Sequence, residues 1–431
     1  MRGVWRASLL LALPLVTGAA TPASDMNALA DRHVKLVLAV GQHDDVFVDA
    51  YYGPPEWKSA AMAAGKRPLA ELLEEAESLA SELAATAPPD DVMARLRRDY
   101  LRAQVHAVGA RVRMLQGTRL DFDVESRELY DAVAPTHDEA YFVHALEKLE
   151  RLVPGPGALA DRVEAMRQHV TIPRDKLDVV FKAAIAECRA RTVAHLTLPA
   201  GEEFRLEYVT GKPWSGYNWY QGKFHSLIQI NTELPIFIDR ALDLACHEGY
   251  PGHHVYNALL EQHLVTDRGW REFTVYPLFS PQSLIAEGSA NFGIDVAFPG
   301  AERVRFERDR LYPLAGLDSG LAEKYHEVLL ALDELSYAGN EAARKYLNGK
   351  ISKDEAVTWL VKYTVTSRPR AEQRVRFFDV YRSYVINYNY GKDLVRRYVE
   401  AHGGTAGQPD VRWKVFGDLI SSPRLPSGLG Q

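Results

Sequence analysis

This chain of 431 residues has few cysteines, no long apolar run and no excess of basic charge. Lys+Arg number 51 against Asp+Glu 57, so the net charge of −6 argues against a nucleic-acid-binding surface, which needs clustered basic side chains. The longest apolar run near the start, ASLLLALPLV, is too short to anchor the chain permanently in a membrane. A serine hydrolase is not supported either, because the Gly-X-Ser-X-Gly elbow is absent.

The N-terminal residues are typical of a secretory signal peptide. Two arginines precede the apolar run, and small residues follow it. We therefore expect residues 1–20 to be removed by cleavage near Ala19 or Ala20 and the protein to be exported, to the periplasm or the medium. The two cysteines, Cys188 and Cys246, could pair in an oxidising compartment. Cys246, however, lies in an apolar helix, so we expect it to be a small buried residue and no disulfide to form.

Most of the sequence predicts helices. Amphipathic segments with caps and Pro-Gly breaks run from residue 25 to about 200, and further helices are expected at 236–247, 253–264, 282–298, 317–348, 353–364 and 370–402. One strand is predicted at SLIQINT, residues 226–232, because polar and β-branched residues alternate there. The prediction is a mainly α fold with a small β region before the helix that carries His247. We expect one domain over 25–420 with a central cleft, and a mobile tail over 421–431.

The stretch CHEGYPGHH, residues 246–254, combines a His-Glu pair with two later histidines. In a regular helix, six residues turn about 240° beyond one circle, so His253 would lie opposite His247. Seven residues restore the face for His254, but the rise is then about 10 Å, too far for one metal ion. Pro251 and Gly252 are poor residues for a helix interior. The helix should therefore deform between Glu248 and His253, and His253 becomes the expected second metal ligand, with His254 as the alternative.

A third ligand is offered by Glu287, on a predicted helix whose small residues allow close packing. Two His and one Glu form a common zinc site in hydrolases, with one position left open for water. Asn291 lies one turn after Glu287, and Asp243 lies one turn before His247. Either could accept a hydrogen bond from a ligand imidazole and so orient it.

Two motifs, CHEGYPGHH and AEGSANFG, resemble those of a bacterial family called domain of unknown function 885, which is grouped with the zincin (gluzincin) metallopeptidases. The resemblance extends over about residues 30–402 and implies a large helical zincin-like domain with a Zn²⁺ ion. Gly252-His253 also matches the Gly-His of helical zinc carboxypeptidases, which favours His253 over His254. The family's third ligand falls on Glu287.

The same resemblance implies a tyrosine near the C-terminus that stabilises the oxyanion. In RSYVINYNYGKDLV the family's Pro-Gly-Gln is replaced by Arg382-Ser383-Tyr384, but Tyr388 keeps its place three residues before Gly391. Tyr388 is therefore the expected donor, and Tyr390 the alternative. Packing of a tyrosine-rich helix would explain these residues equally well.

The resulting hypothesis is an exported hydrolase with one zinc ion per chain that cleaves short peptides, with exopeptidase action preferred. Glu248 would take a proton from the attacking water, and Tyr388 would stabilise the oxyanion. Gln229 and Asn231 would bind substrate if the strand 226–232 paired with an extended peptide at its edge.

Two alternatives stay open at this stage. One is a non-catalytic binding protein whose structural metal is closed by a fourth ligand such as His254. The other is a zinc amidase that acts on a non-peptide amide.

Overall fold

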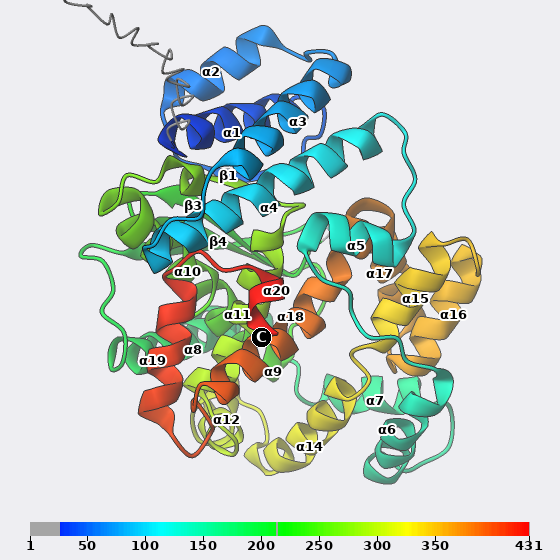
Figure 1. Cartoon of the computed structure of the whole chain (residues 1–431). Coiled ribbons are helices and arrows are strands. Elements are labelled where there is room, and N and C mark those ends of the chain that lie inside the picture. The colour runs from blue at the N-terminus through cyan, green and yellow to red at the C-terminus, as the bar shows by residue number, and fades with distance from the viewer. Residues whose placement is uncertain (1–25, 213, 431) are drawn as a thin grey trace, which may run out of the picture.

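The computed structural model describes residues 26–212 and 214–430, and most of them are helical (Figure 1). The predicted signal peptide over residues 1–20 lies outside the described residues. Within them, no helix has the length and apolar character needed to cross a membrane. The prediction of a mainly α protein with a small β region before the His247 helix is confirmed.

In chain order, the helices are α1 (Met26–Val40), α2 (Pro55–Ala64), α3 (Leu69–Ala85), α4 (Val92–Leu115), α5 (Phe122–Tyr130), α6 (Glu139–Leu152), α7 (Leu159–Gln168), α8 (Leu177–Val193), α9 (Ile238–Leu244), α10 (His253–Leu260), α11 (Pro281–Ala297), α12 (Glu302–Phe306), α13 (Tyr312–Ala315), α14 (Ala322–Asp333), α15 (Ala338–Leu347), α16 (Lys353–Tyr363), α17 (Arg368–Tyr381), α18 (Ile386–Ala401), α19 (Pro409–Ile420) and α20 (Pro426–Leu429). Short π-helical segments are η2 (Ala245–Gly249), η3 (Glu261–Thr266) and η5 (Glu307–Leu311), and short 3-10 segments are η1 (Arg174–Lys176), η4 (Arg271–Thr274), η6 (Ser319–Leu321) and η7 (Arg382–Val385).

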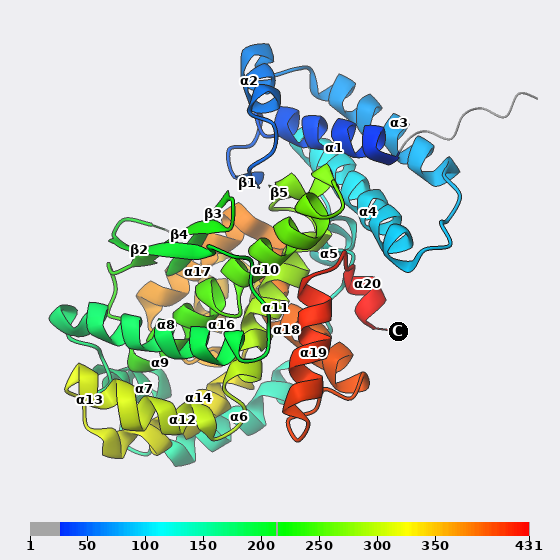
Figure 2. The same cartoon turned by 90° about the vertical axis from the view of Figure 1, so that its left-hand side faces the viewer.

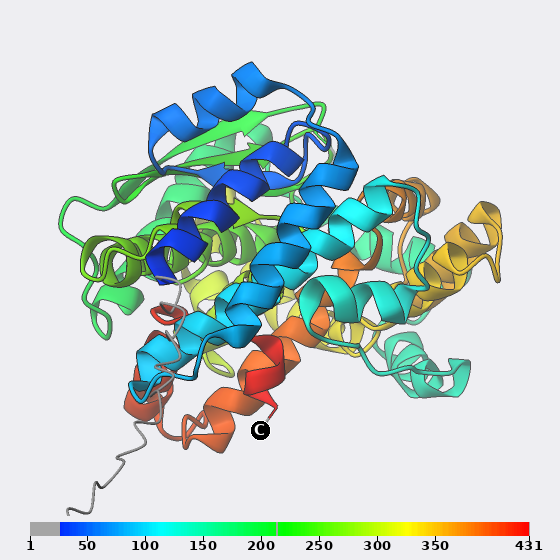
Figure 3. The same ribbon diagram turned by 45° about the horizontal axis from the view of Figure 1, so that its top comes forward.

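The N-terminal helices α1, α3 and α4 lie together along one side of the molecule (Figures 1 and 3). Their sequences explain the packing. In α3, Leu72, Ala76, Leu79 and Leu83 recur at helical spacing and are all buried. The start of α4 is capped by Asp91, whose side chain accepts a hydrogen bond from the backbone of the first turn.

The β region consists of two small sheets (Figure 2). The strands β1 (Val48–Tyr51) and β5 (Val275–Pro277) pair antiparallel. The strands β2 (Glu203–Val209), β3 (Gly216–Gly222) and β4 (His225–Asn231) form a second sheet in the order β2-β4-β3. The predicted strand coincides with β4 to within one residue, and its alternate residues Ser226, Ile228 and Ile230 are buried.

A close crossing of α11 and α18 forms the centre of the fold. A Cβ added to Gly288 would lie 2.5 Å from the backbone of Gly391, so neither position tolerates a side chain. The two helices run side by side in Figures 1 and 2. Because they touch at their backbones, Glu287 on α11 reaches Tyr384 of η7, and Asn291 on α11 reaches Tyr388 of α18.

Two long helices predicted from periodicity are each broken in the structure. The segment 317–348 divides into η6, α14 and α15, and the segment 370–402 divides into α17, η7 and α18. In the second, Arg382 has φ of +52°, a left-handed value that no helix interior contains. The break gives α18 a direction of its own beside α11.

The last residues also differ from the expected mobile tail. Residues 426–429 form α20, the Ser427 amide donates to Asp131, and Leu429 is buried. Leu429 therefore packs against apolar residues from other parts of the chain, and the composition of the tail does not reveal these contacts.

The expectation of two free cysteines is wrong. Cys188 on α8 and Cys246 in η2 form a disulfide, with their Cα atoms 5.8 Å apart, a normal separation for such a bond. The sequence places them 58 residues apart, and only the packing of α8 against η2 brings them together.

Candidate metal centre

The segment from Ala245 to His253 departs from a regular α-helix, as its sequence predicts. The α-helical turns of α9 give way to the π-helical η2, a tight turn follows, and α10 begins at His253. In that turn the Gly252 amide donates to the Cys246 carbonyl at 2.9 Å. A Cβ on Gly252 would lie 1.9 Å from the His247 carbonyl oxygen, so glycine is required there. The turn returns His253 to the side of His247, and their Nε2 atoms lie 3.1 Å apart.

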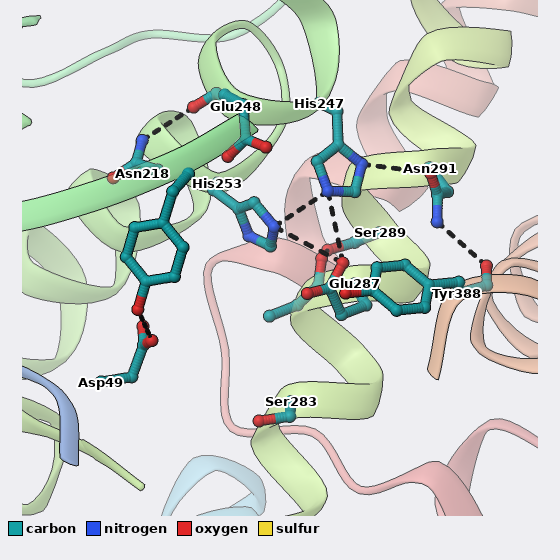
Figure 4. Close-up of polar contacts among 12 residues, drawn as sticks. Asp49, Asn218, His247, Glu248, His253, Ser283, Glu287, Ser289, Asn291 and Tyr388 are labelled. Atoms are coloured by element: carbon teal, nitrogen blue, oxygen red, sulfur yellow. Dashed lines mark hydrogen bonds and ion pairs between the residues drawn. The ribbon is translucent and has the colours of Figure 1, made fainter. Parts of the chain in front are cut away.

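Glu287 from α11 completes a group of three possible metal ligands. Its Oε2 lies 3.2 Å from Nε2 of His247 and 3.6 Å from Nε2 of His253 (Figure 4). Donors held about 2 Å from a tetrahedral ion lie about 3.3 Å from one another, so the three atoms have the spacing of a zinc site. Among the described residues, this is the group of His, Cys, Asp and Glu side chains close enough together to hold an ion.

The charges of His253 and Glu287 act strongly on each other. Burial alone would lower the pKa of His253, but Glu287, Glu248 and Asp49 raise it to about 9. Burial alone would raise the pKa of Glu287, but the two histidines lower it well below its usual range. The metal-free site therefore holds an imidazolium–carboxylate pair. A metal ion that binds here displaces that proton, because ligand imidazoles must be neutral.

Two neighbours orient these ligands. Oδ1 of Asn291 lies 3.1 Å from Nδ1 of His247, so that nitrogen can donate and leave Nε2 free for the ion. The Asn291 amide in turn donates to the Tyr388 carbonyl at 3.0 Å. On the carboxylate side, the Tyr384 hydroxyl donates to Oε1 of Glu287 at 2.8 Å, which leaves Oε2 for the ion.

Glu248 has the position that a general base requires. It follows His247 in η2, is 5% exposed, and its carboxylate points toward the two histidines (Figure 4). The Asn218 amide on β3 donates to the Glu248 carbonyl at 2.7 Å and so ties this residue to the sheet. Burial raises the pKa of Glu248. The two histidines oppose this rise and the negative charge of Glu287 adds to it, and the net shift is upward. A raised pKa makes a carboxylate a better proton acceptor.

Of the predicted tyrosines, Tyr388 faces the site and Tyr390 does not. The side chain of Tyr388 extends toward Glu287 (Figure 4), and burial together with Glu287 and Glu248 keeps its pKa well above 10, so its hydroxyl is a proton donor. The ring of Tyr390 instead lies beneath Arg397. Tyr384 is a residue that sequence reasoning missed. It stands one turn before Tyr388, and this helical spacing is the signal that could have identified it.

His254 points away from the metal ligands into a closed polar cluster. It is fully buried, with Nε2 3.0 Å from Oε2 of Glu202 and Nδ1 2.9 Å from the Ser226 hydroxyl. The same Glu202 accepts from Tyr250 at 2.6 Å and from Arg189 at 2.6 Å. Because Tyr250 and His254 flank the turn, Glu202 holds both ends of the segment that presents His253.

Three predicted contacts are wrong. Asp243 does not touch His247. Its oxygens pair with Arg303 at 2.8 Å and with Arg240 at 3.0 Å. The strand that carries Gln229 and Asn231 is central, with β2 and β3 on its two sides, so its backbone cannot pair with a peptide.

Their side chains are also occupied within the protein. The Gln229 carbonyl accepts from Trp219, and the Asn231 amide donates to the carbonyls of Lys212 and Trp214. The strand beside Glu248 is β3, which lies at the sheet edge. Alternation alone does not distinguish a central strand from an edge strand.

A further acidic side chain reaches the site from the N-terminal half. Asp49 lies at an irregularity of β1, where the register with β5 shifts, and it hydrogen-bonds the Tyr217 hydroxyl of β3 (Figure 4). Burial raises the pKa of Asp49 to about 6. The Tyr217 hydrogen bond and the charge of His253 oppose this rise, and the charges of Glu287 and Glu248 add to it. Bulges commonly redirect a side chain near an active site, but the sequence contains no mark of this one.

Comparison with known proteins shows related folds but no family. No protein-family model matches the chain, and no curated protein matches it. Among solved structures, a proposed lipoprotein from Colwellia psychrerythraea is 14% identical with a TM-score of 0.50, covering 87% of this chain and 71% of that one. The chain has that protein's fold.

Two further structures are more distant. A proposed lipoprotein of unknown function from Shewanella oneidensis is 13% identical, with a TM-score of 0.43, over 84% of this chain and 76% of that one. The M32 carboxypeptidase from Deinococcus radiodurans R1 is also 13% identical, with a TM-score of 0.38, over 94% of each chain.

Proposed function

We propose that this protein is an exported zinc-dependent hydrolase that cleaves amide bonds of short peptides with water as the nucleophile. The observation that carries the proposal is the convergence of His247, His253 and Glu287 beside the carboxylate of Glu248. Three protein donors leave one position of a tetrahedral ion open, as in catalytic zinc sites, whereas structural sites usually have four protein ligands.

The residues around the ligands have the chemistry that such a reaction needs. Bound zinc would polarise the scissile carbonyl and make water more acidic. Glu248 accepts the water's proton and later donates it to the leaving amine. The Tyr388 hydroxyl donates to the carbonyl oxygen as negative charge develops there. Asn291 and Tyr384 hold two of the ligands in the orientation that this requires.

The non-catalytic alternative loses its main support in the environment of His254. That residue was the candidate for a fourth, closing ligand, but Glu202 and Ser226 occupy its two nitrogens. Export is supported by the disulfide, which is typical of oxidising compartments, and by the predicted signal peptide. The Colwellia protein of the same fold is also described as a proposed lipoprotein.

The test combines metal analysis with one conservative substitution. The purified protein should hold about one zinc per chain, and Glu248→Gln should keep that zinc while losing roughly 10²–10⁴ in hydrolysis rate on a mixed short-peptide library. Glu77→Gln, at an exposed position of α3, serves as the matched control and should retain full activity. A protein without stoichiometric metal, whose activity survives chelation, would overturn the proposal. Faster cleavage of N-acyl amides than of any peptide would favour the amidase alternative.

A further inference from the structure

One face of α17 lines the side of the site that contains the tyrosines. Residues 370, 374, 377 and 381 recur every three or four positions and so lie on one face of this helix. The Phe377 ring centroid lies 6.3 Å from that of Tyr388, and the Tyr381 centroid lies 6.0 Å from that of Tyr384. The face that carries Arg370 and Arg374 is therefore turned toward the two tyrosines that contact the metal centre.

Arg374 on this face has no acidic partner among the described residues. Most other arginines near the centre are paired, as Arg240 and Arg303 are with Asp243. The Arg374 guanidinium instead packs over Gly339, where an added Cβ would lie 2.8 Å from Nη2. Its side chain is exposed to solvent, yet burial lowers its pKa, and the nearby titratable group is the Tyr388 hydroxyl. An accessible cation thus lies near the proposed oxyanion donor.

Positive charge continues from Arg374 along the same side. Arg370, one turn earlier, lies over the Phe237 ring at 5.2 Å. Burial lowers its pKa, the nearby carboxylate of Glu164 opposes this effect, and Arg167 and Arg240 add to it. Arg240 acts in turn on Glu248.

The other end of this helix face is acidic. There Tyr381 lies close enough to Asp49 for that carboxylate to raise its pKa, after the larger effect of burial. This face therefore has the Asp49 carboxylate near Tyr381 at one end and the guanidinium groups of Arg374 and Arg370 toward the other.

We infer that Arg374, supported by Arg370, binds the C-terminal carboxylate of the substrate, so that the enzyme acts as a carboxypeptidase on short peptides. This inference rests on the proposed function and adds the substrate's end group to it. A guanidinium binds a carboxylate through two parallel hydrogen bonds, and the interaction is strong where water is partly excluded.

The test measures binding, so it needs no turnover. Calorimetry on the Glu248→Gln protein compares trialanine with trialanine amide, which differ only in the terminal charge. The free acid should bind roughly 10–100-fold more tightly, and Arg374→Gln should remove most of that difference while Arg374→Lys keeps part of it. Arg376→Gln is the matched control, because residue 376 is exposed on the opposite face of α17.

The outcomes separate this inference from the proposed function. Equal binding of acid and amide by the Glu248→Gln protein would overturn the carboxylate site, and so would an Arg374→Gln variant that weakens both ligands alike. If an acetylated Ala-Glu-Ala amide bound as tightly as trialanine and depended equally on Arg374, the site would recognise acidic side chains, and the carboxypeptidase assignment would be wrong. If the wild-type protein did not hydrolyse peptides, while the Glu248→Gln protein still bound trialanine more tightly than its amide, the proposed function would be wrong and the carboxylate site would stand.

Discussion

His253 and His254 are neighbours in the chain but belong to two different environments. His253 faces His247 and Glu287, and its side chain is 12% exposed. His254 is fully buried and has a hydrogen-bond partner at each nitrogen. The His253 side of the turn thus presents three possible metal ligands, whereas the His254 side is a closed hydrogen-bond network. The difference shows that two adjacent identical side chains can divide into one that faces a candidate metal site and one that supports the turn.

The closed side explains how the open side keeps its shape. Glu202 accepts from Tyr250 and contacts His254, the residues on either side of the turn, so this turn cannot move without breaking buried hydrogen bonds. Burial alone would raise the pKa of Glu202, but His254, Tyr250 and Arg189 lower it, so Glu202 remains a carboxylate. A ligand set held in this way loses little order when it binds an ion.

The largest effect is expected on the open side. His253→Ala should weaken zinc binding by at least about 100-fold, because it removes a ligand. It should also lower the stability of the metal-free protein, because the buried Glu287 carboxylate loses its imidazolium partner. Competition with a chelator measures the affinity, and His263→Ala, at an exposed histidine in η3, is the control. Retention of zinc with wild-type affinity would show that His253 is not a ligand.

The disulfide next to His247 should contribute to stability rather than to metal binding. Replacing Cys188 and Cys246 together with serine should cost about 2–4 kcal/mol in the free energy of unfolding, since it releases a long loop in the unfolded chain. Urea denaturation measures this cost. The zinc content should stay near one per chain, and loss of zinc at unchanged stability would contradict the expectation.

The pKa of His33, a buried histidine far from the site in sequence, shows the effect of burial on an imidazole that no carboxylate offsets. His33 on α1 is 1% exposed, and burial lowers its pKa to about 4. Above pH 6.5 the imidazole is neutral in both the folded and the unfolded chain, so its protonation does not affect stability. As the pH falls from about 6.5 to 4, His33 binds a proton in the unfolded chain but stays neutral in the folded protein. The free energy of unfolding should therefore fall by up to about 3 kcal/mol. His33→Gln should reduce this loss in urea titrations, whereas the exposed control His106→Gln should not.

The smallest effect is expected on the closed side. Glu202→Gln keeps the shape but removes the charge, and it should cost about 1–2 kcal/mol in stability and weaken zinc binding roughly tenfold. A changed visible spectrum of the cobalt-substituted protein would show that the His253 geometry has moved. Arg189→Gln removes a half-exposed partner of the same carboxylate and should have a weaker effect. If Glu202→Gln lowered stability but left the affinity and the spectrum unchanged, its role would be structural alone.

Much of the fold and part of the site could be predicted from local sequence. Helical periodicity located α3 and α11, and alternation located β4, because these patterns reflect which face is buried. The same reasoning joined α17 to α18, since the positive φ of Arg382 leaves no trace in hydrophobic spacing. It also misplaced Asp243, because an acidic residue one turn from a ligand has several possible partners, and here the arginines are closer.

By itself, the sequence determined that the helix carrying His247 must deform before His253. The geometry of a helix and the chemistry of Pro251-Gly252 allow no other way to bring two of these histidines to one ion. The tertiary structure decided everything that depends on segments distant in the chain. It placed Tyr384 on Glu287, Glu202 on His254 and Cys188 on Cys246, because such contacts arise from how the packed helices cross.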